Sequence, residues 1–318
     1  MTKTVPTLQD VANKAGVSKA VASRALSSEK KPISAAKKVL VLKAAEEIGY
    51  VANPFAKSLN SNTTGLVAIV VNHINDISDL ELFDSLLEGL QKIGKLPVFI
   101  RLKSEDDIKR ITNNSFVHRV DAALIFSDLL KPEKMSKLFH TPMVINLNGQ
   151  NWPNTWSLLI DEEQGIKDAI GYAASKGISH AVLIGGRENS AIEALRIGYY
   201  QKYFKLNKIT VVDFYHCDYS YTKAKSVPIQ WDSLPEKCAI FCTSDSMAMA
   251  IVDTFITKKD TPMIIGFDNT LFSHFGAYQF PSIGYSTPKL IEILINVLTN
   301  THTSKHQGIL KISNNFVI

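Results

Sequence analysis

The sequence has few features of exported, disulfide-bonded or membrane-spanning proteins. Its 318 residues contain three cysteines, Cys217, Cys238 and Cys242, too few for a disulfide framework and typical of a reducing compartment. No apolar run reaches the roughly 18 residues that cross a membrane. The polar first residues also lack the apolar core of a secretory signal. We therefore expect a cytoplasmic protein without a membrane partner.

Motifs of common enzymes and cofactor sites are also missing. Gly185-Gly186 follows a strand-like run, but neither G-x-G-x-x-G nor G-x-x-x-x-G-K-[ST] is present. There is no serine nucleophile elbow and no H-E-x-x-H. Cys238 and Cys242 have no second Cys or His pair at ligand spacing, so we interpret them as buried core residues. The sequence predicts no metal site, no cofactor and no enzyme.

Positive charge is concentrated at the N-terminus. Residues 1–60 contain ten Lys/Arg and four Asp/Glu, a net charge of +6. The rest of the chain contains 25 Lys/Arg and 26 Asp/Glu, a net charge of −1. A small basic module on a nearly neutral body is typical of a nucleic-acid-binding protein. A solvated basic helix face gives a similar count, so charge alone leaves both interpretations open.

The basic segment predicts a helix-turn-helix. Thr7 is a favourable N-cap, and an apolar stripe at helical spacing follows it. Gly16 ends this helix, and Ser18 caps a second helix over about residues 19–26. A third helix is expected over 35–48, capped by Ser34. Its packing positions are Val39, Leu42, Ala45 and Ile48. Such a module places its second helix in the major groove of DNA.

The same residues resemble the DNA-binding domain of the LacI family, whose usual form is T-x-x-D-V-A-x-x-A-G-V-S-x-x-T-V-S-R-x-L. This sequence follows that pattern from Thr7 to Leu26, with Val21 and Ala22 replacing the usual Thr-Val. The resemblance implies that Lys19, Ala20 and Arg24 face DNA bases. It also implies backbone contacts by Ser18, Ser23 and Ser34, with Thr7 in the same interface. Base contacts give specificity, whereas phosphate contacts set the register.

A short hinge follows the module. Asn53 is an N-cap and Pro54 suits the first helical position, so a helix is expected over 54–60. This segment resembles the LacI-family hinge helix N-x-x-A-R-x-L through Asn53, Ala56 and Leu59. That resemblance implies paired hinge helices in the minor groove, with Leu59 as the wedge that kinks the duplex. A helix that packs on the body is the alternative.

From Leu66 onward, apolar strands alternate with helices in two consecutive sets. The expected strands are 66–71, 96–101, 122–126, 143–146, 181–184, 210–214, 239–242 and 263–266. Helices are expected over 80–94, 105–115, 132–140, 163–176, 191–204, 221–227 and 246–256. Continuous apolar strands separated by helices indicate parallel sheets covered on both faces. Two such sets predict two doubly wound lobes with a ligand site at the carboxyl ends of the strands.

The predicted fold class is an N-terminal helix-turn-helix domain, a hinge helix and a two-lobed α/β body. We divide the chain into the DNA-binding domain, 1–50, the hinge, 51–64, and an effector-binding and dimerisation body, 65–318. Lobe one would comprise 65–160 and 286–304, and lobe two 161–285 and 305–318.

The body also resembles the LacI-family sensor, which is similar to periplasmic sugar-binding proteins. Segments that carry this resemblance include Arg196-Ile-Gly-Tyr199 and Gly266-Phe-Asp268. The resemblance implies that Arg196 and Asp268 contact a sugar-like effector, supported by Asn72, His73, Asp161 and Ser244. A guanidinium and a carboxylate can each form paired hydrogen bonds with neighbouring hydroxyls. Asp161 as a helix cap and Arg196 as a partner of Glu193 are the structural alternatives.

The combined interpretation is a transcriptional regulator, expected to be a repressor. It would bind a palindromic double-stranded operator as a homodimer, or as a tetramer, under control of a small-molecule effector. No leucine heptad follows Asn315, which disfavours a C-terminal coiled coil. The alternative is a sugar-binding protein or an enzyme of the same body fold with incidental DNA affinity.

Overall fold

The computed structural model describes two compact units, Met1–Thr64 and Gly65–Ile318. Described within them are residues 6–26, 32–51, 63–72, 74, 76–112, 119–127, 130–131, 134, 138–141, 143–229, 231–256, 261–300 and 307–318. Most of the predicted hinge, including Asn53, Ala56 and Leu59, lies outside the described residues, as does His73.

The first unit is a helix-turn-helix followed by a third helix. Its helices are α1 (Leu8–Ala15), α2 (Lys19–Ala25) and α3 (Ala35–Ile48). The predicted caps are confirmed: Thr7, Ser18 and Ser34 each accept a backbone N–H of the first turn. Gly16 ends α1 at φ 62°, a left-handed conformation that glycine adopts without strain. The tight turn therefore follows from the capping residues.

The buried face of α3 differs from the predicted one. Val39 and Leu42 are 63% and 46% exposed, whereas Val41, Ala44 and Ala45 are buried against α1 and α2. Of the four predicted positions, Ala45 and Ile48 pack on this core. The helix has apolar residues on every side, so their spacing did not determine which face is buried.

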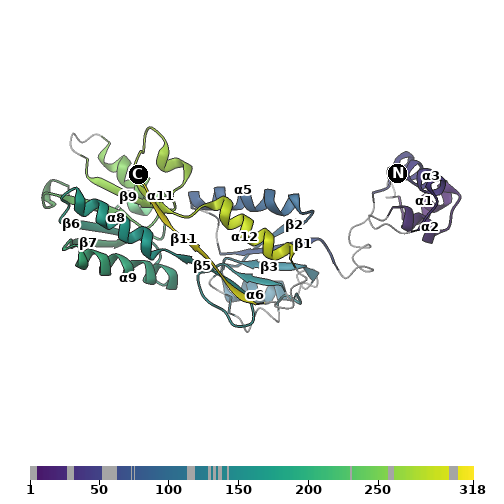
Figure 1. Cartoon of the computed structure of the whole chain (residues 1–318), viewed down its shortest axis with the longest axis horizontal. Helices are drawn as coiled ribbons and strands as arrows, with labels where there is room; N and C mark the ends of the chain where they lie inside the picture. Colours follow the sequence, from purple (N-terminus) through teal and green to yellow (C-terminus); the bar gives the residue numbers. More distant parts are fainter. Residues whose placement is uncertain are drawn as a thin grey trace. The chain divides into compact units, whose positions relative to one another are not determined.

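The first sheet of the body is parallel throughout, in the order β11-β5-β4-β3-β1-β2. Its strands are β1 (Leu66–Val71), β2 (Leu96–Arg101), β3 (Ala122–Ile125), β4 (Val144–Asn146), β5 (Trp156–Asp161) and β11 (Gly308–Ser313). Helices α5 (Ile77–Lys92) and α12 (Thr287–Thr299) cover one face side by side (Figure 1). The other face packs against α6 (Glu105–Thr112).

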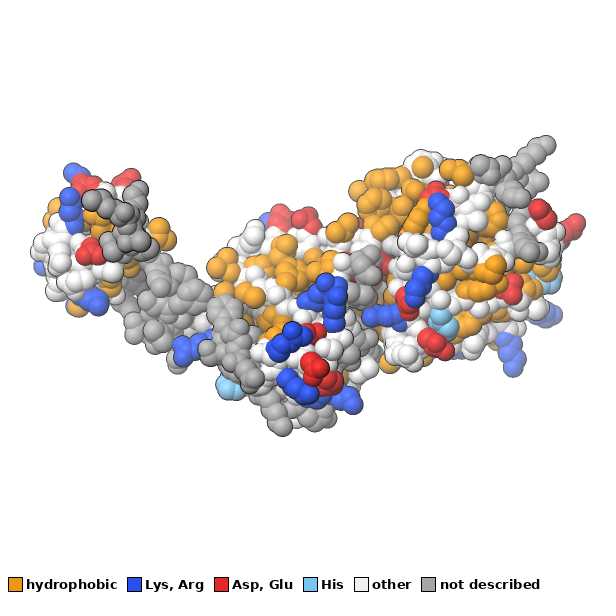
Figure 2. Space-filling model, turned by 180° about the vertical axis from the view of Figure 1, so that it is seen from behind, with side chains coloured by type: hydrophobic (Ala, Val, Ile, Leu, Met, Phe, Trp, Pro, Cys, Tyr) orange, Lys and Arg blue, Asp and Glu red, His pale blue; other side chains and the backbone are white. Residues whose placement is uncertain are grey.

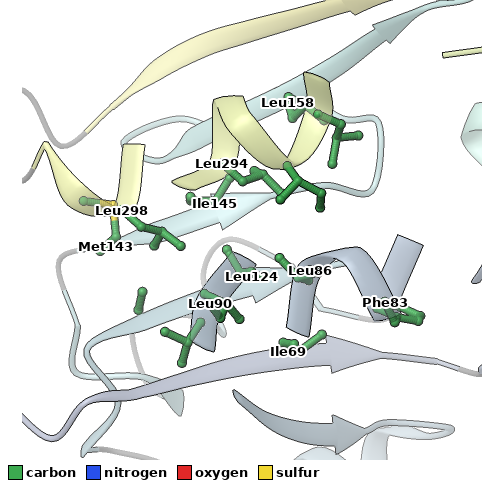
Figure 3. Packing of buried hydrophobic residues seen from close by; sticks show 14 of the residues in the cluster. Ile69, Phe83, Leu86, Leu90, Leu124, Met143, Ile145, Leu158, Leu294 and Leu298 are labelled. Atoms are coloured by element: carbon green, nitrogen blue, oxygen red, sulfur yellow. The ribbon is translucent and has the colours of Figure 1, made fainter. Parts of the chain in front are cut away.

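Leucines of α5 and α12 meet the sheet in a continuous core. Leu86 and Leu90 of α5 and Leu294 of α12 lie against Ile69 and Ile145 (Figure 3). Each is fully buried, and burying one such side chain contributes about 1.5–3 kcal/mol. This packing fixes the N-terminus of α5 at the carboxyl end of β1.

The second sheet has the order β12-β10-β9-β8-β6-β7, parallel except for the antiparallel pair β10–β12. Its strands are β6 (His180–Gly185), β7 (Thr210–His216), β8 (Cys238–Cys242), β9 (Met263–Phe267), β10 (Ser282–Gly284) and β12 (Asn315–Val317). Helices α8 (Glu163–Ser175) and α9 (Ala191–Leu206) cover one face, and α10 (Tyr221–Lys225) and α11 (Asp245–Phe255) the other. All three cysteines are buried and unbonded to one another.

The predicted division of the lobes is wrong at the C-terminus. Residues 305–318 were expected in lobe two, but β11 pairs with β5 in the first sheet and only β12 joins the second. Strand β5 itself was not predicted, because Ser157 and Asp161 interrupt its apolar pattern. The predicted helix 132–140 lies mostly outside the described residues.

Candidate functional sites

Helix α2 presents a polar face to solvent while burying its small residues. Ala22 and Ala25 lie in the core of the unit, whereas Lys19, Ala20, Ser23 and Arg24 are exposed. The Arg24 guanidinium makes one weak intrahelical contact, from Nε to the Ala20 carbonyl oxygen at 3.3 Å. Its other N–H groups make no hydrogen bond to the residues that the structure describes. A guanidinium pairs well with a guanine edge or a phosphate.

The other predicted contact residues of this unit are capping residues. The hydroxyls of Ser18 and Ser34 accept backbone N–H groups. A hydroxyl that accepts in this way can still donate its O–H to a phosphate. The Thr7 hydroxyl donates to Asp10 Oδ2 at 2.7 Å, and the Thr7 backbone N–H donates to the same oxygen at 2.8 Å. These bonds hold the pKa of Asp10 below its usual value. Thr7 therefore fixes the start of α1.

In the body, Arg196 of α9 is bound by a carboxylate of the same lobe. Its Nε and Nη2 donate to the two carboxylate oxygens of Glu162 at 2.8 and 2.6 Å. Nη1 donates to the Thr243 carbonyl oxygen at 3.0 Å and lies 3.5 Å from Glu193 Oε2. The Phe267 ring centroid lies 3.8 Å from the guanidinium carbon. Burial lowers the Arg196 pKa and Glu162 raises it, and the result lies well above the usual value.

Glu193 is the centre of a second set of bonds to the same arginine. Its Oε1 accepts from the Gly186 N–H at 2.6 Å and from the Thr243 hydroxyl at 2.7 Å. Its Oε2 accepts from the Tyr219 hydroxyl at 2.7 Å. The Arg196–Glu193 pairing that the sequence left open is therefore present, but the bidentate partner is Glu162, which sequence reasoning missed. The position of Glu162, directly after Asp161 at the end of a strand, was the feature of the sequence that could have indicated this partner.

Gly186 lies against the ring of Tyr219, which explains the glycine without a bound phosphate. A Cβ on this residue would lie 2.1 Å from the Tyr219 ring, and Tyr219 itself has a φ of 58°. The Arg187 guanidinium carbon lies 5.6 Å from the centroid of the same ring. The Gly185-Gly186 pair thus allows Tyr219 to reach Glu193.

Asp268 lies just beyond β9, among other carboxylates. Burial, followed by the charges of Asp76 and Asp245, raises its pKa well above the usual value, and Arg196 and Glu162 also act on it. Its side chain makes no hydrogen bond to any residue that the structure describes. We name Asp76, Glu162, Asp245, Asp268 and Arg196 the interlobe cluster.

The cluster joins the two lobes. Asp76 caps α5 of lobe one, and its Oδ1 accepts from the Ser246 hydroxyl of α11 in lobe two at 3.1 Å. The Ile77 N–H also donates to Ser246 Oγ, at 3.4 Å. Burial raises the pKa of Asp76, and it raises that of Asp245 to about 6. The carboxyl ends of both sheets therefore meet around a group of buried acids.

The other predicted effector residues occupy structural positions. Ser244 is buried and caps α11 through the Met247 N–H. Asp161 is exposed, and its Oδ1 accepts from the Glu163 N–H at 3.3 Å. The Asn72 side-chain oxygen accepts from the Ser127 hydroxyl at 2.5 Å. The structure thus brings Arg196 and Asp268 into one cluster, while Ser244 caps α11 and Asp161, at the end of β5, accepts a backbone N–H at the start of α8.

In the described part of the chain, no group of three or more His, Cys, Asp or Glu side chains is arranged to hold a metal ion. Within the same residues, no helix combines the length and the apolar character needed to span a bilayer.

The described geometry defines a class: a protein with a helix-turn-helix unit and a two-lobed α/β body. Residues 7–53 match the family model of bacterial regulatory proteins of the lacI family. The HTH-type transcriptional repressor PurR of Vibrio atlanticus is 25% identical over 281 residues, covering 83% of this chain and 82% of that protein. Residues 7–53 therefore carry the DNA-binding domain of that family, and over most of its length the chain is similar to HTH-type transcriptional repressors.

Solved structures agree on the fold. The Lac repressor bound to ONPG in the repressed state superposes with a TM-score of 0.84 at 18% identity, covering 99% of both chains. The lac repressor dimer bound to operator and the anti-inducer ONPF superposes with a TM-score of 0.81 at 18% identity, covering 98% of both chains. The predicted fold class is confirmed.

Proposed function

We propose that this chain is a repressor that binds a palindromic operator as a homodimer and responds to a small-molecule effector between its lobes. The observation that carries the proposal is the exposed face of α2, where Lys19, Ser23 and Arg24 flank the small Ala20. A side chain as small as that of Ala20 lets the helix approach base edges closely. The net charge of +6 over residues 1–60 supplies the non-specific attraction to phosphates.

Arg24, Lys19 and Ala20 would contact bases, and Thr7, Ser18, Ser23 and Ser34 the backbone. Asn53, Ala56 and Leu59 are proposed to form the hinge helix in the minor groove. Replacing Leu59 by Ala should then reduce both operator affinity and DNA bending, measured by gel shift on circularly permuted fragments. An unchanged bend angle would remove Leu59 as the wedge.

A dimer is supported by apolar side chains that the body leaves on its surface. Leu80 of α5 and Leu96 of the edge strand β2 are 62% and 55% exposed. Phe99 of β2 is 39% exposed and contacts Phe83 of α5. Orange side chains gather in patches on the body in Figure 2. Exposed apolar area of this kind is typical of protein interfaces, and one of the similar structures is a repressor dimer.

The effector is proposed to bind at the carboxyl ends of the strands, with contacts from Arg196 and Asp268 and from Asn72, His73, Asp161 and Ser244. A sugar or sugar derivative is the class that the sequence resemblance favours. The effector can change the affinity of the protein for DNA only as far as the effector itself binds one arrangement of the lobes more tightly than the other. The Asp76–Ser246 hydrogen bond links the two lobes. A ligand that changes the arrangement of the lobes would therefore act on this contact.

Selection of DNA fragments by the purified full-length protein tests this proposal. Fragments of its source genome are captured at moderate salt and sequenced. Enrichment of one or a few fragments that share an inverted repeat is expected. Binding that falls steeply with salt and enriches no sequence would contradict a sequence-specific regulator.

A further inference from the structure

The arginine assigned to the effector is already bound within the protein. All three nitrogens of Arg196 donate internally, two of them to the carboxylate of Glu162 at 2.8 and 2.6 Å, and Phe267 stacks on the guanidinium. Both Glu162 and Arg196 are buried, at 4% and 7% exposure. An anionic ligand would have to displace Glu162 from this site. Arg196 is therefore poorly placed to recognise a carboxylate or phosphate.

The charges around Arg196 leave an excess of carboxylates. Glu162 and Arg196 neutralise each other, while Asp76, Asp245 and Asp268 remain in the same cluster. Asp245 has three donors of its own, the Thr270 N–H at 2.7 Å, the Thr270 hydroxyl at 2.9 Å and the Ser282 hydroxyl at 2.6 Å. Asp76 accepts from Ser78 and Ser246. Asp268 has no corresponding donor among the described residues.

The backbone holds Asp268 in an unusual conformation. Its φ is 104°, a region that side-chain-bearing residues rarely adopt, and its N–H donates to the Ile283 carbonyl oxygen at 2.6 Å. Gly284 permits this approach, because a Cβ there would lie 2.5 Å from the Asp268 carbonyl oxygen. Backbone strain of this kind is a feature of functional sites.

An aromatic side chain lies beside this acid. Burial, followed by the charge of Asp268, raises the pKa of Tyr285, and its hydroxyl has no hydrogen-bond partner among the described residues. Asp268 and Tyr285 lie deep in the protein yet keep part of their surface accessible. An accessible carboxylate beside an aromatic ring is a combination that binds organic cations.

We propose that the effector is a cation, a small molecule with a protonated amine or amidine that Asp268 binds beside Tyr285. This inference rests on the proposed function and narrows its effector class. An amino derivative of a sugar fits both the sugar class of the proposed function and the positive charge inferred here, because its hydroxyls can bind the remaining polar groups. The ammonium would supply a donor to Asp268, which has none among the described residues, and balance the charge of the cluster.

A thermal-shift screen of the full-length protein tests the proposal. The probes are several hundred polar metabolites grouped by charge at pH 7.5, including matched sets such as glucosamine, glucose and glucuronate. Each stabilising compound is then titrated calorimetrically against the wild type, Asp268→Asn and, as a matched control, Asp168→Asn. Asp168 is an exposed carboxylate on α8 of the same lobe.

Cationic compounds are expected to stabilise the protein, with affinity reduced at least about tenfold by Asp268→Asn and unchanged by Asp168→Asn. In Glu162→Gln, which weakens the hold on Arg196, the preference should shift towards anionic members of the matched sets. Stabilisation that depends on Asp268 but comes from neutral or anionic compounds would overturn the proposal. So would a screen in which no cation binds through Asp268.

DNA binding separates this inference from the proposed function. If neutral compounds bind through Asp268 and change operator affinity, the regulator stands and the cationic effector is wrong. If no specific operator is found, the proposed function fails whatever the charge of the ligand.

Discussion

Arg196 and Glu162 form a bidentate ion pair in the interior of lobe two, with Nη2–Oε1 and Nε–Oε2 distances of 2.6 and 2.8 Å. Glu162 immediately follows β5 of the first sheet, whereas Arg196 lies in α9 against the second. The pair thus fixes the crossover between the lobes as well as the side chain at the proposed effector site.

Removing Glu162 should destabilise the protein strongly. Glu162→Ala removes the bidentate carboxylate partner and leaves the buried Arg196 charge with the weaker Glu193 contact and the Thr243 carbonyl oxygen. Such a loss costs about 3–5 kcal/mol. Glu163→Ala is the control, because its pair with Lys202 is half exposed and contributes about 1 kcal/mol or less. Urea unfolding followed by circular dichroism measures both. Equal losses for the two variants would show that the buried pair does not form.

Asp245 should give the protein a stability that decreases as pH rises. Burial raises its folded pKa to about 6, from the 3.8 that is usual for an aspartate in the unfolded chain. The folded state therefore binds more protons between these values, and this contribution to stability is present at pH 4 and lost as pH passes 6. The wild type minus Asp245→Asn difference in unfolding free energy should decrease by about 2 kcal/mol over that range.

Asp107 supplies a control of opposite sign. Hydrogen bonds from Lys103 hold its pKa below the usual value. The difference between the wild type and Asp107→Asn should therefore increase with pH. Melting temperatures of the three proteins between pH 4 and pH 7.5 give both slopes. If the stability difference between the wild type and Asp245→Asn did not change with pH, the Asp245 carboxyl would be solvated rather than buried.

The space beside Asp268 should tolerate no side chain at position 284. In Gly284→Ala the added methyl group would lie 2.5 Å from the Asp268 carbonyl oxygen, so the backbone must shift. A loss of about 1–3 kcal/mol is expected, as for other overpacked sites. Gly171→Ala, in the interior of α8 with nothing within 4 Å, should instead stabilise by about 0.5–1 kcal/mol. Calorimetric unfolding of both variants tests the contrast.

Local structure in the DNA-binding unit could be predicted because short-range chemistry determines it. Thr7, Ser18, Ser34 and Gly16 cap or end helices through bonds to residues within five positions. The buried face of α3 could not be predicted, because apolar residues surround the helix. Tertiary contacts with α1 and α2 decide which of them are buried.

The site in the body was only partly predictable for the same reason. The positions of Arg196 and Asp268 followed from a family resemblance, but their partners depend on long-range contacts. Glu162 is 34 residues from Arg196 in the chain, and Asp76 of lobe one acts on Asp268 of lobe two. Strands β5 and β12 carry polar residues, so neither has the apolar pattern of a buried strand.

The most direct test of the central claim is the DNA affinity of Arg24→Ala. The enriched fragment and an unrelated duplex of the same length are titrated by fluorescence anisotropy with the wild type, Arg24→Ala and Lys14→Ala. Lys14 pairs with Glu47 at 3.2 Å in the same unit and serves as the charge control. Loss of one bidentate base contact costs about 1–3 kcal/mol. Arg24→Ala should therefore weaken specific binding about 10- to 100-fold, with a much smaller effect on the unrelated duplex. If Arg24→Ala weakens both duplexes equally, or neither, then α2 does not read the operator.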